Sequence, residues 1–213
     1  MIVMIAKRAS VGRAAAVAAL AAALWAVPAA AQEAPDAMVK RVSQDVLQIV
    51  KTDAKVRAGD QARLREVVET KLAPNFDFAR MTALAMGRNW RTATPEQQKV
   101  LSEQFKTLLV RTYSSALTQY KDETIEYKPL RMDAGATDAT VRTAVIRSGN
   151  PPVPIDYSMA KGADGNWKAY DVIVGGVSLV TNYRDEFNEQ VKSGGIDGLI
   201  KVLTQKNGGA PGA

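Results

Sequence analysis

The sequence predicts an α+β fold, in which a curved antiparallel sheet of four strands carries helices on one of its faces. Three observations lead to this prediction. Apolar residues recur at helical spacing between residues 35 and 120, and they alternate with polar residues between 124 and 174. Helical spacing then returns after Gly175-Gly176. A succession of helices, strands and helices is typical of a sheet that is covered on one face.

Three helices are predicted in the first part of the pattern. The apolar residues of 35–55 stand three and four positions apart, and those of 64–72 repeat this spacing behind Asp60 as an N-cap. Pro74 ends the second helix, because a proline cannot continue the helical hydrogen bonds. A short third helix is then predicted over 76–85.

A long helix is predicted from Pro95 to about Tyr120, because it has a strong start signal. Thr94 suits the N-cap position, and Pro95 suits the first helical position. Gln97 stands where a capping box needs an amide or a carboxylate.

The alternating pattern predicts four strands that follow one another as a meander. The strands span residues 124–130, 140–147, 153–161 and 166–174. Residues 162–165 are typical of a tight hairpin turn, and residues 148–152 of a looser connection. Two further helices are expected after the sheet, with Ser178 as a cap and with Gly194-Gly195 between them.

The N-terminal segment 1–31 has the pattern of a secretory signal peptide. A positively charged stretch precedes an apolar run over 14–27 and the small residues Ala29-Ala30-Ala31. We predict cleavage after Ala31, export to the periplasm, and a mature single domain of residues 32–213. The run of 14 residues is shorter than the roughly 18 to 20 that a spanning helix needs, so a retained membrane anchor is the less favoured alternative.

The composition excludes several kinds of chemistry. The chain has no cysteine and no histidine, so it can form no disulfide, no Cys or His metal site and no Ser-His-Asp triad. It has 28 Lys and Arg against 22 Asp and Glu, but three of these cations and no acids lie in residues 1–31. The mature chain therefore carries only about +3, and we expect no nucleic-acid partner, no metal and no cofactor.

Strand pairing predicts which side chains share a face of the sheet. Pairing across the turn at 162–165 places Tyr157 opposite Tyr170. Pairing across the loop at 148–152 places Thr143 beside Tyr157. One face then collects Val141, Thr143, Val145, Ile155, Tyr157, Met159, Tyr170 and Val172, and the other includes Trp167, Ala169 and Asp171. The apolar face can either pack against the long helix as a solid core or line a pocket.

The second face contains the candidate site for an enzyme. In this register Asp156 falls opposite Asp171, and two neighbouring carboxylates can divide the roles of acid and base. Arg142 lies diagonally from Asp156, so a salt-bridged or solvated pair is the favoured structural alternative. A slip of one residue in the register would separate the two aspartates.

Several short motifs follow one another along the mature chain at characteristic spacing. They are Phe76-Asp77-Phe78, Gly87 with Trp90, Thr112-Tyr113, Asp156-Tyr157, Trp167 with Tyr170-Asp171-Val172, Gly176-Val177-Ser178-Leu179, Asn182-Tyr183-Arg184 with Phe187, and Gly198-Leu199-Ile200. In this order they resemble the MlaC family of soluble periplasmic phospholipid carriers, also known as toluene-tolerance proteins. The resemblance extends over nearly all of the mature chain.

This resemblance implies a phospholipid carrier rather than an enzyme, with a deep apolar pocket between sheet and helices. It implies a monomer that exchanges lipid between an outer-membrane lipoprotein-porin complex and an inner-membrane ABC transporter, and so maintains lipid asymmetry of the outer membrane. The alternatives are an exported enzyme that uses Asp156 and Asp171, a protein-interaction module that binds no lipid, and a hopanoid carrier of the same family.

The pocket that the resemblance implies is expected to draw on the two central helices and the apolar sheet face. Its predicted lining is Met81, Leu84, Leu109, Tyr113, Leu117, Val141, Thr143, Val145, Ile155, Tyr157, Tyr170, Val172 and Val177. For each of them the alternative is ordinary packing in the core. Asp77, Arg88, Arg91 and Arg184 are expected at the surface, as candidates for docking or helix capping.

Overall fold

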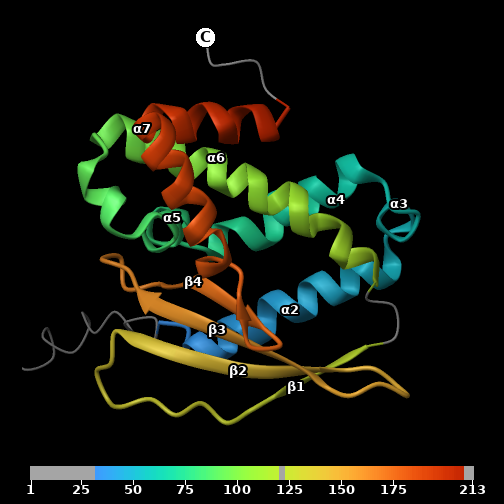
Figure 1. Cartoon of the computed structure of the whole chain (residues 1–213). Helices are drawn as coiled ribbons and strands as arrows, with labels where there is room; N and C mark the ends of the chain where they lie inside the picture. The colour runs from blue at the N-terminus through green and yellow to red at the C-terminus, as the bar shows by residue number, and fades with distance from the viewer. Residues whose placement is uncertain (1–31, 120–122, 209–213) are drawn as a thin grey trace, which may run out of the picture. The chain divides into compact units, whose positions relative to one another are not determined.

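Helices and an antiparallel sheet form the layers of the computed structural model, which describes residues 32–119 and 123–208 (Figure 1). The helices gather on one side of the sheet, and α2 (Pro35–Thr52) lies directly against its strands. The α+β class predicted from the sequence is therefore confirmed. The predicted signal peptide and the predicted end of the long helix at Tyr120 fall outside the described residues.

Four helices precede the long helix in the described chain, and the last three of them have side-chain caps at their starts. They are α2 (Pro35–Thr52), α3 (Ala54–Arg57), α4 (Gln61–Val67) and α5 (Phe78–Met86). The carboxylates of Asp53, Asp60 and Asp77 accept backbone N–H groups at the starts of α3, α4 and α5. Asp77 is thus a helix cap, one of the two roles expected for it. Between α4 and α5 the chain makes a π-helical turn, Val68–Leu72, and a 3-10 turn, Ala73–Asn75.

The long helix α6 begins at the predicted residue. Thr94 Oγ1 accepts the N–H of Gln97 at 3.2 Å, and the side-chain oxygen of Gln97 accepts the N–H of Thr94 at 3.0 Å. This reciprocal pair is the capping box. The helix spans Pro95–Tyr113 and continues as a 3-10 turn, Ser114–Gln119.

The capping box provides a test of this helix start. Thr94→Ala should lower the free energy of unfolding by about 1 kcal/mol, because the N–H of Gln97 loses its acceptor. Urea denaturation followed by circular dichroism measures the change. Thr107→Ala is the control, since its hydroxyl lies mid-helix and only adds a bond to the carbonyl of Glu103; it should change stability by less than about 0.5 kcal/mol. Equal losses in the two variants would contradict the role of the cap.

The last helix, α7, spans Arg184–Lys206 and is broken as predicted. Gly195 has φ 67° and ψ −170°, a backbone conformation that kinks the helix and that residues with a Cβ rarely adopt. Ser178 Oγ accepts the N–H of Thr181 at 2.9 Å. This bond holds the chain just before the 3-10 turn Thr181–Tyr183, which leads into α7, but the N-cap residues of the turn and of α7 are Val180 and Tyr183, so the predicted cap role of Ser178 is wrong.

Five strands of the described residues form one antiparallel sheet in sequence order. They are β1 (Thr124–Tyr127), β2 (Asp138–Ile146), β3 (Val153–Lys161), β4 (Trp167–Val174) and β5 (Val177–Ser178). The first four correspond to the predicted meander. The short β5 was not predicted; it turns back on β4 through Gly175-Gly176, both with positive φ.

The pairing of β2 with β3 differs from the prediction by two residues. Thr143 lies opposite Ile155 rather than Tyr157. The connecting loop is longer than expected, because the N–H of Asn150 turns back to the carbonyl of Arg147 and the two following prolines have no N–H for the ladder. A shift of two residues leaves every side chain on its predicted face.

A β-bulge between β3 and β4 overturns another part of the predicted register. The pairing shifts inside β3, so that Tyr157 lies opposite Val172 rather than Tyr170. Because β4 has one extra residue at the bulge, the β4 residues that precede it point to the opposite face of the sheet from the one predicted. Trp167 and Ala169 therefore pack in the core with residues of the apolar face, although the sequence predicted them on the opposite face.

The largest core cluster joins α5, α6 and α7. Phe105 is fully buried, and its ring lies edge-on to Phe187 and Tyr183, with centroids 5.1 and 5.2 Å away. A separate cluster joins α2, α3 and α4 around Leu64. Within the described residues, no helix has both the length and the hydropathy to cross a membrane, and no three acidic residues gather as a metal site.

Candidate functional site

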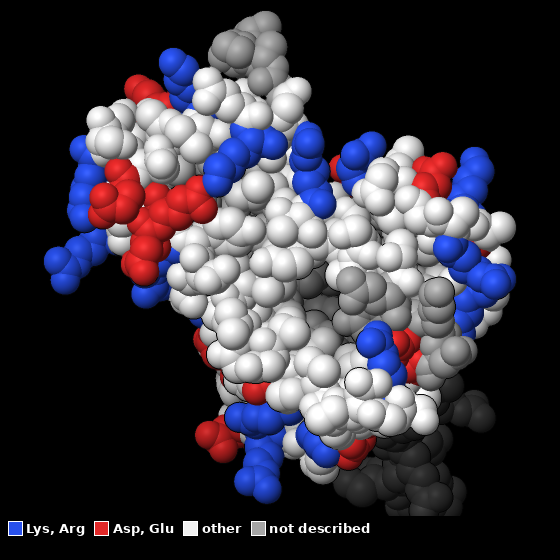
Figure 2. Space-filling view, turned by 45° about the vertical axis from the view of Figure 1, so that its right-hand side comes forward, with Lys and Arg blue, Asp and Glu red and all other residues white. Residues whose placement is uncertain are grey.

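An apolar cavity of about 400 Å³ lies between the sheet and the helices. Strands β1 to β4 supply one wall, and α2, the π-helical turn, α5, α6 and the 3-10 turn after α6 supply the others. Among the described residues, none that line it carries a charge. Figure 2 shows a hollow in the surface with mostly uncharged residues around it. The apolar sheet face thus borders a space instead of forming a solid core throughout.

Most of the residues predicted to line a pocket do border this cavity. They are Met81, Leu109, Tyr113, Leu117, Thr143, Val145, Ile155, Tyr157 and Val172. The structure brings them together from α5, α6, the 3-10 turn after α6, and strands β2, β3 and β4. Their contact with a ligand stays a prediction.

Four residues of the predicted lining lie elsewhere. Leu84 borders a separate surface groove beside α5, and Val141 is enclosed in the core beneath α2. Tyr170 packs under the guanidinium group of Arg80, which lies 3.7 Å from its ring centroid, because the bulge turns it away from the cavity. Val177 is 56% exposed at the sheet edge.

Sequence reasoning missed one whole wall of the cavity, which comes from α2 and the π-helical turn. The missed residues of this wall are Ser43, Val46, Leu47, Val50, Val68, Leu72 and Ala73. The other missed residues are Phe76, Phe78, Val110, Ser114, Ala116, Ile125, Val174 and Leu179. The helical spacing of apolar residues in α2 identifies its buried stripe. The same spacing is found whether a helix packs against a core or borders a cavity, so it does not distinguish the two.

Hydroxyl groups of the cavity wall bond to the protein itself. Ser43 Oγ donates to the carbonyl of Val39 at 2.6 Å and lies 2.7 Å from the hydroxyl of Tyr127. Thr143 Oγ1 donates to the carbonyl of Ile155 at 2.9 Å. Since these groups already have partners, they offer little to a polar ligand, and the wall behaves as an apolar surface.

Tyr113 is a polar residue of the wall, and its phenol lies near that of Tyr183. Burial, with a smaller effect of the neighbouring phenol of Tyr183, raises the pKa of Tyr113 to about 12. The phenol is therefore neutral at physiological pH. It adds no charge to the cavity.

The raised pKa of Tyr113 predicts a change in stability at alkaline pH. Because the folded pKa lies above the ordinary value of 10.0, neutral Tyr113 stabilises the fold fully below about pH 10, and this contribution is lost as pH rises towards 12. Tyr113→Phe should show a shallower fall in the free energy of unfolding across this interval, measured by urea denaturation at several pH values. Parallel curves for the variant and the wild type would contradict it.

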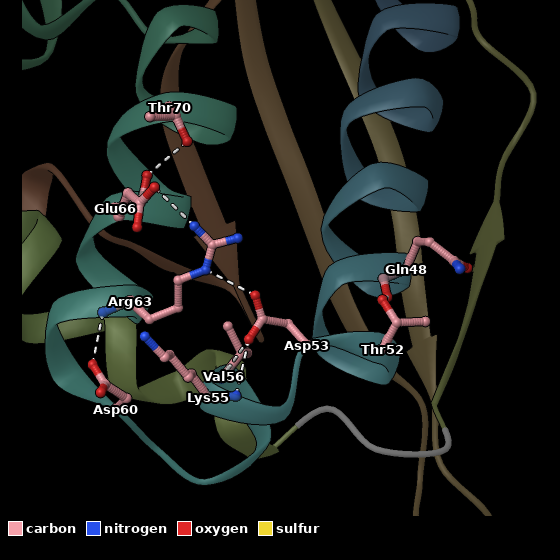
Figure 3. A network of polar contacts seen from close by, with 9 residues as sticks. All are labelled: Gln48, Thr52, Asp53, Lys55, Val56, Asp60, Arg63, Glu66 and Thr70. Carbon is pink, nitrogen blue, oxygen red and sulfur yellow. Dashed lines mark hydrogen bonds and ion pairs between the residues drawn. The ribbon is translucent and has the colours of Figure 1, made fainter.

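An ionic network holds the helices behind the α2 wall together (Figure 3). Arg63 Nε donates to Asp53 at 2.8 Å, and its Nη1 lies 2.8 Å from Glu66. Asp53 also accepts the N–H groups of Lys55 and Val56, and together these partners lower the pKa of its carboxyl. The network fixes α4 against the end of α2. It thereby supports the cavity wall, which is formed by α2 and by the π-helical turn that follows α4.

The aspartates of the candidate enzyme site are not a pair in the structure. Asp156 lies opposite Arg142 on β2 and Ile173 on β4, and Asp171 lies opposite Ser158, because both pairings of β3 differ in register from the prediction. Asp171 instead accepts the hydroxyl of Ser178 at 2.6 Å and so holds the turn between β4 and β5. The predicted acid-base dyad is therefore wrong.

The fold and its cavity have counterparts among known proteins. A family model described as MlaC protein matches residues 40–205. The chain belongs to the MlaC family. Relatives of this MlaC chain include the toluene tolerance protein ttg2D of Pseudomonas putida, 26% identical over 168 residues, which are 78% of this chain and 77% of the relative.

Two further relatives of this MlaC chain have names that refer to phospholipid. The intermembrane phospholipid transport system binding protein MlaC of Haemophilus influenzae is 23% identical over 179 residues, 83% of this chain and 84% of that protein. A solved structure of the phospholipid-binding protein from Ralstonia solanacearum, in complex with a phospholipid, is 40% identical. It aligns with a TM-score of 0.75 and covers 84% of this chain and 98% of its own.

Proposed function

We propose that this MlaC protein is a periplasmic carrier that encloses the acyl chains of a phospholipid in its apolar cavity. The single observation that carries the proposal is the cavity wall, which is uncharged and whose serine and threonine hydroxyls bond to backbone carbonyls. Such a wall suits hydrocarbon, while the polar head group would stay in solvent. The phospholipid bound to the Ralstonia solanacearum relative supports the same cargo.

The energetics of lipid in water explain why a protein of this kind is needed. At roughly 0.8 kcal/mol per methylene, two acyl chains with about 30 methylenes would lose on the order of 24 kcal/mol on exposure to water. Free diffusion between membranes is therefore negligible. Both the bilayer and the cavity bury the chains, so transfer between them can be nearly balanced, and its direction must come from the partners.

The partners that we propose are an inner-membrane ABC transporter complex and an outer-membrane lipoprotein-porin complex. The name of the Haemophilus influenzae relative, which refers to intermembrane phospholipid transport, supports such a route. Export by the predicted signal peptide would place the mature protein between the two membranes. The family and the phospholipid-bound relative point to a carrier and not to an enzyme.

Transfer between vesicles tests the proposal. Donor vesicles containing a self-quenched fluorescent phospholipid are mixed with unlabelled acceptor vesicles, and the residues 32–213 are added. We expect the fluorescence to rise at a rate proportional to the protein concentration, because each molecule carries lipid through water. A rate equal to that of spontaneous exchange would contradict the proposal. If the protein transfers a hopanoid but not a phospholipid, the proposed carrier function would hold and the proposed cargo would be wrong.

A further inference from the structure

A second concavity lies on the surface of the helical layer. It is a groove of about 920 Å³ between α5, the 3-10 turn Gly87–Thr92 that follows it, and the first half of α7. No residue lines both this groove and the apolar cavity. Lipid in the cavity therefore leaves the groove free.

The groove has an excess of positive charge. Its cations are Arg80, Arg88, Arg91, Arg184 and Lys192, and its acids are Asp185 and Glu189. Lys192 is paired with Glu189 at 2.6 Å. Arg88 and Arg91 are exposed, and neither forms an ion pair within the described part of the chain. These two guanidinium groups are available to an anionic partner.

Two other arginines of the groove are held in place. Arg184 donates from Nε and one Nη to the carbonyl of Leu84, at 3.3 and 3.0 Å, which leaves further N–H groups of the guanidinium to bind a ligand. Arg80 is bonded to Asp138 at 2.7 Å and stacked on Tyr170. Side chains fixed in advance lose little conformational entropy on binding, which favours the binding of a carboxylate.

The lining between these charges includes apolar surface. Ala83, Leu84 and Trp90 line the groove, and the amide of Asn89 donates to that of Asn188 at 2.9 Å, joining its two sides. A tryptophan next to exposed arginines is a composition typical of protein-binding sites. The matching ligand has both carboxylates and apolar side chains.

We propose that this groove docks an acidic polypeptide segment of a partner protein. Its carboxylates would pair with Arg88 and Arg91, and an apolar side chain would lie against Trp90. The groove is concave, and Asp185 and Glu189 stand in its α7 wall, where they would repel a flat anionic membrane. A narrow acidic segment can instead lie along the opposite side of the groove, where the 3-10 turn carries Arg88 and Arg91.

The test uses residues 32–213 and a labelled synthetic peptide rich in Glu and Leu. Fluorescence anisotropy should show saturable binding that weakens with salt, because the contacts are largely ionic. The double variant Arg88→Glu with Arg91→Glu should bind about tenfold more weakly or worse. Its lipid content should equal that of the wild type. Peptide binding therefore tests the proposed docking groove, and lipid content tests the proposed carrier function, independently of each other.

The controls separate a docking groove from general charge effects. Arg131→Glu with Lys201→Glu makes the same change in net charge on exposed residues outside the groove and should bind the peptide like the wild type. No saturable binding by the wild type, equal binding of a peptide with Gln in place of Glu, or equal losses in both double variants would overturn the proposal. So would a groove variant that loses binding only to phosphatidylglycerol vesicles, because the occupant would then be a membrane.

Discussion

Replacing Val145 with Trp is expected to prevent the protein from loading lipid. Val145 is 8% exposed, and its side chain borders the cavity from β2. The indole would occupy space that we assign to acyl chains. Exclusion of even two methylenes would weaken binding by about 1.6 kcal/mol, which is more than tenfold, so the lipid recovered per protein after incubation with vesicles should fall at least about tenfold.

The matched control for this variant is Val153→Trp. Val153 lies opposite Val145 on β3 but is 42% exposed and does not border the cavity. It should load lipid normally. Both variants should keep the far-UV circular dichroism of the wild type, because the new ring of Val145→Trp enters empty space. Unfolding of Val145→Trp would indicate a solid core at this position, and full lipid loading would place the chains elsewhere.

Phe105→Ala should give the largest loss of stability among simple truncations of the helical layer. The side chain is fully buried where α6 meets α7 and contacts the rings of Phe187 and Tyr183. Removal of a buried phenylalanine lowers the free energy of unfolding by about 3 to 5 kcal/mol. That is a large part of the roughly 5 to 15 kcal/mol typical of a domain, so the midpoint of urea denaturation should fall markedly.

Val100→Ala on the same helix is the comparison for Phe105→Ala. Val100 is 41% exposed, and its truncation should change the free energy of unfolding by less than about 0.5 kcal/mol. Lipid bound in the cavity adds to the stability of the folded state, so both variants should be measured after delipidation. A loss below about 1 kcal/mol for Phe105→Ala would contradict the cluster described for α5, α6 and α7.

The sequence predicted the helices and strands well because their signals are local. The capping box at Thr94 and the break at Gly195 depend on neighbouring residues, and both are as predicted. The register between β3 and β4 depends on a bulge whose extra residue lies in β4, and no residue type marks it in the sequence. Together with a pairing at the turn that places Lys161 opposite Trp167, the bulge moved Trp167 and Ala169 to the other face and separated the two aspartates of the proposed dyad.

The candidate site was predicted in part for a similar reason. Sheet residues such as Val145 and Ile155 alternate at a spacing of two, which identifies their face. An apolar residue such as Val46 or Leu72 suits both the packed core and the lining of a cavity. Only the three-dimensional packing decides which of the two it contacts. The resemblance to the MlaC family predicted that a pocket exists, and the structure then showed where it lies.

Native mass spectrometry of purified residues 32–213, followed by solvent extraction, tests whether the cavity holds phospholipid. We expect a mass increment equal to at least one phospholipid, and the same lipid in the extract. We also expect delipidated protein to regain this increment after incubation with phospholipid vesicles. A protein that purifies without lipid and stays without it after that incubation would contradict the assignment of the cavity as a phospholipid site.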